Sequence, residues 1–364
     1  KSLESKLDTQ VKVGMMRTHT QGLAVAVIDN GTVKLVKTWG KRNTNGDPLT
    51  PDTVMYGASL TKAVFAYTVM QLVEEGKINL DTSIAAYLPK PLPEYADEED
   101  KYAGWQYLAG DERWRQLTPR ILLAHSSGFS NFGFLEPDGK LKFHFDPGKR
   151  YAYSGDGFIL LQFVIERGLE LDVGNEMQQR VFDKLDMHNT SMVWRPDFST
   201  NLADGWKIDG NIEPHDERSK TRAAGSMDTT ISDFAKFAAA YMRGDGLKQR
   251  SRDELTAAQL KITTASQFPS LQPELASNAQ PKDLAAGLGV ITFNGPMGRG
   301  FFKGGHNDST GNMWVCLEKQ KKCVVILSND VRSEPLFPEI ITLIMGNAGI
   351  PWAWEYGALD WAMK

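Results

Sequence analysis

The chain has 364 residues, of which 41% are hydrophobic and 24% are charged, and its formal net charge is -4 at pH 7. This composition is typical of a globular protein with a large core, built as one large domain or two closely joined lobes. The charge gives no broad positive field, which argues against nucleic acid as a partner. The longest apolar run, residues 63–73, contains Gln71 and is far shorter than the roughly 20 residues that cross a bilayer, so no membrane span is expected.

The first predicted elements are the two strands of a hairpin. Residues Gly22–Asp29 form an apolar run, Asn30-Gly31 is a two-residue turn signal, and Thr32–Trp39 alternate in polarity. The chain is therefore predicted to begin with an antiparallel sheet, and not with the strand-helix-strand unit of a dinucleotide-binding fold.

A mostly buried helix is predicted from Ser59 to Glu75, with Gly76 as its C-terminal cap. Ser59 and Lys62 lie three residues apart at its start, so their side chains share one face, about 5–6 Å apart at Cβ. A lysine so placed can take the proton of the serine, and the free N–H groups of a helix start favour developing negative charge. Ser59 is a candidate nucleophile, but a Ser-x-x-Lys arises by chance on the order of once in such a chain.

The middle of the chain is predicted to be mainly helical. Residues 89–111 are rich in proline, acidic and aromatic residues without a clear period, which indicates a surface insertion that is either a lid or a solvated decoration. We expect His125 to brace the turn after a short helix that Thr118-Pro119 begin. Further helices are predicted after Gly155 and over residues 176–185 and 232–242.

The end of the chain returns to strands, predicted over residues 288–293, 301–303, 313–317 and 323–328, before a final helix near 335–345. Cys316 and Cys323 are the two cysteines, and they face each other if a hairpin turns at Lys319-Gln320. They form either a cross-strand disulfide, which would fit an oxidising compartment, or two reduced core thiols. Strands at both ends predict a sheet domain of residues 1–75 and 285–364 and an inserted, mainly helical domain of residues 76–284.

Three motifs follow one another along the chain: Ser59-Leu60-Thr61-Lys62, Tyr153-Ser154-Gly155 before a long helix, and Lys303-Gly304-Gly305 on a strand. With Leu123-Ala124-His125-Ser126-Ser127-Gly128 and Ala224-Gly225-Ser226 they resemble the serine β-lactamase and penicillin-binding-protein superfamily, closest to its class C, DD-peptidase and family VIII esterase branch. The resemblance covers most of the chain in the expected order. It implies an α/β (α+β) fold of the β-lactamase/transpeptidase type: a five-stranded antiparallel sheet flanked by helices, a helical lobe, and the active site between them.

The resemblance also implies a serine hydrolase that works through an acyl-enzyme. Ser59 takes the role of nucleophile and Lys62 that of its proton partner. Tyr153, with Lys62, would act as the general base and later return the proton to the leaving group, which requires Lys62 and Lys303 to lower a phenol pKa that is ordinarily near 10. The backbone N–H groups of Ser59 and His306 would form the oxyanion hole. Substrate contacts are expected from neighbouring motif positions: Ser154, Gly155, Gly304, Gly305 and Asn307.

The third motif has two candidate starts, Lys303 and His306. We favour Lys303 because it keeps a glycine two residues on and because its separation from Asn329 resembles that of the family. The chain departs from the family pattern at Gly155, where Asn is usual, and at Gly304, where Thr or Ser is common. These changes remove an amide and a hydroxyl that contact the substrate, and they lower the expectation of efficient β-lactam hydrolysis.

The predicted substrates are small esters, D-amino-acid amides or peptides, or β-lactams. The alternative is a catalytically silent relative that binds cell-wall peptides or a partner. An α/β-hydrolase is disfavoured because there is no Gly-x-Ser-x-Gly. The six histidines show no metal-ligand spacing, so neither a metal nor a cofactor is expected.

Three further features leave alternatives open. His215 and His306 either touch the substrate or lie on the surface. Several aromatic residues either line an acyl pocket or pack in the core or lid: Trp105, Tyr107, Phe129, Phe132 and Phe134. The chain starts at Lys1 without a leader, which fits a periplasmic or secreted protein whose leader is removed, with a cytoplasmic location as the alternative. The oligomeric state is not predicted.

Overall fold

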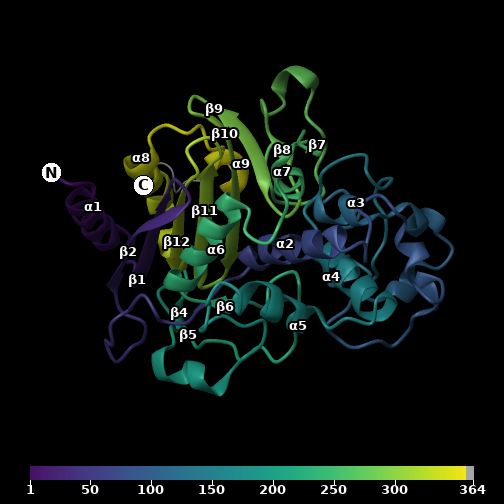
Figure 1. Cartoon of the computed structure of the whole chain (residues 1–364), viewed down its shortest axis with the longest axis horizontal. Coiled ribbons are helices and arrows are strands. Elements are labelled where there is room, and N and C mark those ends of the chain that lie inside the picture. The colour runs from purple at the N-terminus through teal and green to yellow at the C-terminus, as the bar shows by residue number, and fades with distance from the viewer. Residues whose placement is uncertain (358–364) are drawn as a thin grey trace.

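The computed structural model describes residues 1–357. A large antiparallel sheet forms one part of the molecule and a mostly helical part lies beside it (Figure 1). The sheet has eight strands in the order β2-β1-β12-β11-β10-β9-β8-β7 among the described residues. The strands are β1 (Gly22–Asp29), β2 (Thr32–Gly40), β7 (Leu260–Lys261), β8 (Ala285–Ala286), β9 (Ile291–Gly295), β10 (Gly298–Asn307), β11 (Thr310–Leu317) and β12 (Lys322–Ser328).

This sheet is wider than the five strands that the resemblance implied, and that number is corrected here. The strands β2, β1, β12, β11 and β10 form a continuous set, and β9 pairs with the far side of β10. The strands β8 and β7 then extend the edge. They have two residues each, too few for the alternating polarity that identifies a strand in a sequence.

Two turns fix the register of the sheet as the sequence predicted. Asn30 and Gly31 both adopt positive φ, 51° and 73°, in the turn between β1 and β2. The turn between β11 and β12 places Cys316 opposite Cys323, with Cα atoms 4.1 Å apart, and joins the two sulfurs in a disulfide. Of the two alternatives for these cysteines, the structure therefore shows the cross-strand bridge.

The helices cover the sheet and build the second part of the molecule. Helix α6 packs against β1, β12 and β2, and α8 packs against β12 and α1. Helix α2 lies between the sheet and the helical part (Figure 1). The helices are α1 (Leu3–Thr18), α2 (Leu60–Glu74), α3 (Pro119–Leu123), α4 (Gly155–Phe163), α5 (Val173–Met177), α6 (Ile231–Arg243), α7 (Gln249–Thr256), α8 (Phe337–Met345) and α9 (Trp352–Tyr356). The remaining strands form two short pairs, β3 (Met55–Tyr56) with β6 (Asp228–Thr229) and β4 (Gly205–Trp206) with β5 (Ile212–Glu213).

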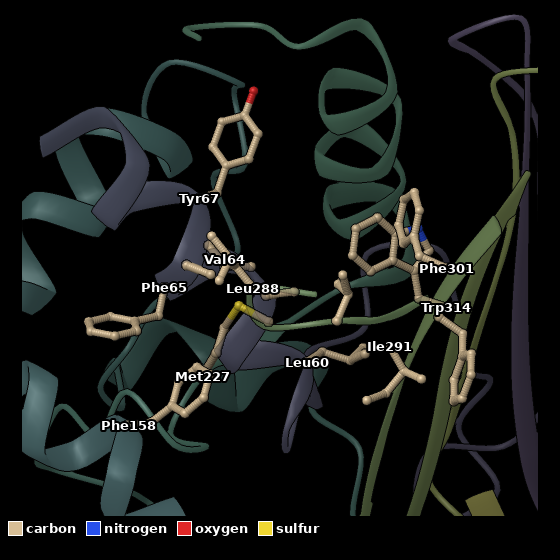
Figure 2. Close-up of a cluster of buried hydrophobic side chains, with 14 of the residues drawn as sticks. Leu60, Val64, Phe65, Tyr67, Phe158, Met227, Leu288, Ile291, Phe301 and Trp314 are labelled. Carbon is tan, nitrogen blue, oxygen red and sulfur yellow. The ribbon is translucent and has the colours of Figure 1, made fainter. Parts of the chain in front are cut away.

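Helix α2 is the centre of the core. Every residue from Leu60 to Leu72 is buried, which is possible only for a helix that has neighbours on all sides. Figure 2 shows its side chains between Phe158 of α4 and Trp314 of the sheet. Truncating one such buried aromatic side chain to alanine costs about 3–5 kcal/mol. The N-terminus of α2 is therefore held rigidly between the two parts of the molecule.

The insertion at residues 89–111 is anchored by aromatic side chains. Tyr95, Tyr102 and Trp105 surround Phe163, with ring centroids 5.0, 4.9 and 5.6 Å from its own. Trp105 is fully buried, so this segment is packed onto α4 and is more than a solvated decoration. Its role as a lid, like the division into two domains, stays a prediction. Within residues 1–357, none of the helices combines the length and apolarity that crossing a bilayer takes.

Candidate active site

Ser59 lies at the N-cap position of α2, after a sharp turn in the chain. Ala58, immediately before it, has a φ of 49°, a left-handed conformation that is uncommon for a residue with a Cβ atom. Thr61 supports this turn, because its hydroxyl donates a hydrogen bond to the carbonyl oxygen of Ala58 at 2.6 Å. The Ser59 side chain does not cap its own helix. Its hydroxyl is therefore left to interact with other side chains.

The structure brings four predicted residues together around this hydroxyl. The Nζ atom of Lys62 lies 3.2 Å from the Oγ atom of Ser59, and the phenol oxygen of Tyr153 lies 2.8 Å from it. The Nζ atom of Lys303, from β10, lies 3.4 Å from the same phenol oxygen. Residues from the first, middle and last thirds of the chain therefore form one connected polar cluster.

Burial makes Lys62 a weak cation. Its Nζ atom donates a hydrogen bond to the carbonyl oxygen of Ala224 at 2.6 Å and forms no ion pair with any residue of the described chain. Loss of solvation lowers the pKa of Lys62 well below its ordinary value, and the positive charges of Lys303 and Arg222 lower it further. A neutral amine beside a serine hydroxyl has a lone pair that can accept the serine proton.

Burial has the opposite effect on Tyr153. Desolvation raises the pKa of its phenol above the ordinary value, and the hydrogen bond with Ser59 offsets only part of this rise. The lowering of the phenol pKa that a phenolate base would need is not found, because the loss of solvation and the negative charge of Glu355 both raise it. The phenol therefore keeps its proton at neutral pH and is suited to donate it.

His125 braces the segment that carries Tyr153, in addition to lying in the turn after α3 that the sequence predicted for it. Its Nδ1 atom accepts a hydrogen bond from the backbone N–H of Ser154 at 3.0 Å. Its ring stacks on that of Tyr153, with the centroids 4.3 Å apart. Burial, together with the charges of Lys62 and Lys303, lowers the pKa of His125 well below its ordinary value. A neutral imidazole can therefore position the phenol without adding a further positive charge to the cluster.

The cluster opens into a cavity of about 1230 Å³. Ser59, Lys62, Tyr153 and Lys303 line it, and so do Gly304, Gly305 and His306 of β10. The rest of the lining includes Arg222 and aromatic and polar side chains of loops and α9, among them Asn131, Phe132, Phe268 and Glu355. A cavity of this size admits a small organic molecule. Among the described residues, no group of His, Cys, Asp and Glu side chains is arranged to hold a metal ion.

A family model described as Beta-lactamase matches residues 7–346. The chain belongs to the beta-lactamase family. It is 21% identical over 224 residues to Protein flp of Staphylococcus aureus (strain MRSA252), which covers 57% of this chain but only 42% of that protein's length. It is 25% identical over 278 residues to the uncharacterized protein BpOF4_21049 of Alkalihalophilus pseudofirmus, covering 74% of this chain and 73% of the other.

Solved structures share the fold of this beta-lactamase family member. An octameric penicillin-binding protein homologue from Pyrococcus abyssi superposes with a TM-score of 0.74 at 19% identity, covering 94% of this chain and 77% of the other. The D-alanine carboxypeptidase AmpC from Burkholderia cenocepacia superposes with a TM-score of 0.73 at 18% identity, covering 94% and 98%. At these identities the likeness shows the fold, which is the predicted β-lactamase/transpeptidase type.

Position 305 shows why this family's third motif ends in glycine here. A Cβ atom on Gly305 would lie 3.0 Å from the carbonyl oxygen of Gly57 and 3.2 Å from the backbone nitrogen of Ser59. Glycine therefore lets β10 lie directly against the start of α2. The His306 side chain turns outward, where its Nδ1 atom lies 2.9 Å from Oε2 of Glu334, so only its backbone is available for the predicted oxyanion hole.

The structure does not bring three of the predicted substrate-binding residues to the cavity wall. The Ser154 hydroxyl donates to the carbonyl oxygen of Ser130 at 2.8 Å and accepts from the N–H of Gly157, which makes it the N-cap of α4. Gly155 lies under the ring of Phe132. Asn307 lines a separate small cavity, and its Oδ1 atom accepts from the N–H of Ser309 at 2.9 Å.

Sequence reasoning missed several side chains of the cavity wall, and two of them lie directly beside the motifs. Asn131 accepts a hydrogen bond from the N–H of Gly155 at 2.8 Å, so it places an amide beside the motif position that lacks one. Glu355, from α9, lies beside Lys303. Burial lowers the pKa of Lys303 to about 8, against the opposing charge of Glu355, and raises the pKa of Glu355 to about 7, against Lys303 and Gln267. Neither residue belongs to a recognisable motif, and their positions depend on loop and C-terminal packing.

Proposed function

We propose that this protein is a serine hydrolase that forms an acyl-enzyme on Ser59. The observation that carries the proposal is the joint contact of the Ser59 hydroxyl with the Lys62 amine at 3.2 Å and the Tyr153 phenol at 2.8 Å. A nucleophile within hydrogen-bond reach of both a base and an acid has the two partners that acyl transfer needs.

In the acylation half-reaction, the Ser59 oxygen attacks the carbonyl carbon of the substrate while its proton passes to the neutral amine of Lys62. The backbone N–H groups of Ser59 and His306 would stabilise the negative oxygen of the tetrahedral intermediate, a contribution in which one donor is typically worth about 10²–10³ in rate. The carbon–leaving-group bond then breaks, and Tyr153 donates its proton to the departing atom. The ammonium of Lys62 then returns a proton to the phenolate of Tyr153, which leaves the amine neutral again.

In the second half-reaction, water attacks the ester that links the acyl group to Ser59. Lys62 accepts a proton from this water, the bond from carbon to the serine oxygen breaks, and the serine recovers its proton. The products are a carboxylic acid and the free enzyme. Each half-reaction therefore uses the same cluster, first with the leaving group and then with water in the same place.

Small esters and D-amino-acid amides are the proposed substrates, with β-lactams hydrolysed slowly. Gly304 supports this choice, because it lacks the hydroxyl that the family pattern places at this position, whereas Asn131 supplies an amide beside Gly155. Turnover of p-nitrophenyl acetate and butyrate, D-amino-acid p-nitroanilides and nitrocefin tests it. We expect measurable short-chain esterase turnover that is lost in Ser59→Ala, and little nitrocefin turnover. Rapid nitrocefin hydrolysis would contradict the substrate choice, and activity that survives Ser59→Ala would contradict the mechanism.

We also propose a periplasmic or secreted location. The Cys316–Cys323 disulfide supports it, because such bridges persist in oxidising compartments and are rare in the cytosol. Fractionation of the native host, with the protein detected by antibody, tests this proposal. Recovery in the cytosolic fraction would contradict it.

A further inference from the structure

Helix α9 holds Glu355 in the cavity by burying the residue next to it. The ring of Trp354 is buried and packs against that of Tyr151, with the centroids 5.8 Å apart. The carbonyl oxygen of Trp354 also accepts a hydrogen bond from the N–H of Gln267 at 2.8 Å. The backbone of Glu355 is therefore fixed by contacts that do not involve its own side chain.

One oxygen of the Glu355 carboxylate accepts a hydrogen bond, and the other, called the open oxygen, has no partner among residues 1–357. Its Oε1 atom accepts a hydrogen bond from Nε2 of Gln267 at 2.9 Å. The phenol of Tyr151 donates to the oxygen of the same amide, which fixes the amide with its N–H groups toward Glu355. The Oε2 atom makes no hydrogen bond or ion pair with any residue in the described range 1–357, and Glu355 lines the cavity.

The open oxygen of Glu355 lies where the side chain of a larger residue at position 304 would be. A Cβ atom on Gly304 would collide with Oε2 of Glu355. Position 304, one residue after Lys303, therefore presents a carboxylate where a small side chain would otherwise stand. Lys303 and Glu355 influence each other's pKa without forming an ion pair, and the other charged groups that act on Glu355 are Glu334 and His306.

The leaving group of a substrate would lie on this side of Ser59. This step rests on the proposed function, in which Tyr153 donates a proton to the departing atom. The phenol of Tyr153 lies between the Ser59 hydroxyl, at 2.8 Å, and the Lys303 amine, at 3.4 Å. An atom that receives the phenol proton therefore leaves toward Lys303, Gly304 and Glu355.

We propose that Glu355 determines specificity by selecting substrates whose leaving group carries an ammonium or similar cation and by disfavouring a carboxylate there. An open carboxylate oxygen in a partly desolvated cavity attracts a cation and repels an anion more strongly than it would in water. The Lys303 amine also faces this side, but it is held by the carbonyl oxygen of Gly304 at 2.7 Å and lies 3.4 Å from the Tyr153 phenol. Oε2 of Glu355, by contrast, has no partner among residues 1–357 and is the charged atom left to bind a leaving group.

Three thioacetates with leaving groups of different charge test the proposal: acetylthiocholine, its neutral isostere S-(3,3-dimethylbutyl) thioacetate, and S-acetyl-4-mercaptobutanoate. Thiol release gives kcat/KM for each. We expect the cation to exceed the neutral isostere by about 10- to 100-fold, the range for a contact between opposite charges that is partly screened from water, and the anion to fall below the isostere. In Glu355→Gln, the ratio of kcat/KM for the cationic substrate to kcat/KM for the neutral isostere should fall toward one. Glu217→Gln makes the same change at an exposed residue of the cavity rim and should keep the ratio.

A second readout separates this inference from the proposed function. Phosphonothioates with the same cationic and neutral leaving groups need only attack by Ser59, and intact-protein mass reports the modification. Modification of Ser59 or hydrolysis of the isostere supports the hydrolase. If, in that case, the cationic substrate has no advantage over the isostere, or if Glu355→Gln keeps that advantage, the inference about Glu355 is overturned and the hydrolase stands. If no thioester is hydrolysed and no phosphonothioate modifies Ser59, both are overturned.

Discussion

The amine of Lys62 lies 3.2 Å from the hydroxyl of Ser59 and 2.6 Å from the carbonyl oxygen of Ala224, and it is buried. Both neighbours can interact with a neutral amine, and no carboxylate among the described residues pairs with it. Because burial lowers the pKa of Lys62, the side chain is placed to act as a base and not as a structural cation.

Lys62→Arg separates these two roles. Arginine keeps the positive charge but cannot give up its proton in a protein, so a base function is lost while a charge function is kept. We expect the rate of Ser59 acylation to fall about 10²–10⁴-fold in Lys62→Arg and equally in Lys62→Met. Stopped-flow measurement of the p-nitrophenol burst gives the rate. An arginine variant that acylates near the wild-type rate would show that charge alone suffices.

The pH dependence of acylation follows from the lowered pKa of Lys62. Only the neutral amine accepts the serine proton, so the rate rises as the pH rises through the pKa of Lys62 and then levels off. Since burial lowers that pKa well below the ordinary 10.5, the plateau should be reached well below pH 10.5. The profile of kcat/KM for a neutral ester measures this. A rate that is still increasing tenfold per pH unit at pH 10 contradicts it.

Tyr153→Phe should affect poor leaving groups more than good ones. The phenol pKa is raised, so Tyr153 acts as a proton donor, and p-nitrophenolate hardly needs the proton that an alkoxide or amine needs. We expect a loss of about 10²-fold or more for alkyl esters and amides and a clearly smaller loss for p-nitrophenyl esters. The two substrate classes are compared on the same enzyme preparations, with folding checked by circular dichroism. Equal losses for both classes would argue for a positioning role only.

Gly304→Thr tests the space between β10 and α9. Its Cβ atom would collide with Oε2 of Glu355, so the carboxylate must move away from its observed place. We expect Gly304→Thr to lower the preference for a cationic leaving group about as much as Glu355→Gln does. The double variant Gly304→Thr/Glu355→Ala removes the collision and should regain stability relative to Gly304→Thr in denaturant titrations. If the single variant is as stable as wild type and keeps the preference, position 304 does not depend on Glu355.

We expect the Cys316–Cys323 disulfide to stabilise the fold without affecting catalysis, since neither cysteine lines the cavity beside Ser59. It joins residues only seven apart, so the loop-entropy model gives a stabilisation of about 2–3 kcal/mol. Cys316→Ala/Cys323→Ala should unfold at a lower denaturant concentration while keeping its esterase kcat/KM. Thiol titration of the unfolded wild-type protein should detect no free thiol without reductant. Two free thiols would contradict the bridge.

The sequence predicts the elements that its local pattern defines. The Asn30-Gly31 turn, the apolar α2 and the facing cysteines each carry a local signal, and the structure confirms them. The two-residue strands β7 and β8 carry none, so the local pattern does not predict them; the number of five strands came from the family resemblance. Their pairing is decided by the edge of the sheet that they meet and not by their own residues.

The candidate site likewise contains residues that the sequence predicts and residues that it does not. Ser59, Lys62, Tyr153 and Lys303 belong to ordered motifs, and the structure places them in contact. The direction of the Tyr153 pKa shift could not be predicted, because it depends on the burial of the phenol and on the charge of Glu355, which no motif places there. Glu355 could not be found either, since Trp354 and Gln267 hold it through tertiary contacts that no sequence spacing encodes.

Trapping of the acyl-enzyme tests the central claim most directly. The wild-type protein and Ser59→Ala are incubated with a fluorophosphonate probe and with penicillin G, intact masses are measured, and the modified peptide is sequenced by tandem mass spectrometry. We predict that the fluorophosphonate adds a single adduct at Ser59, formed by the wild type and absent from Ser59→Ala. An adduct of equal yield in Ser59→Ala, or a wild-type protein that stays unmodified by both probes, would contradict a covalent mechanism at this serine.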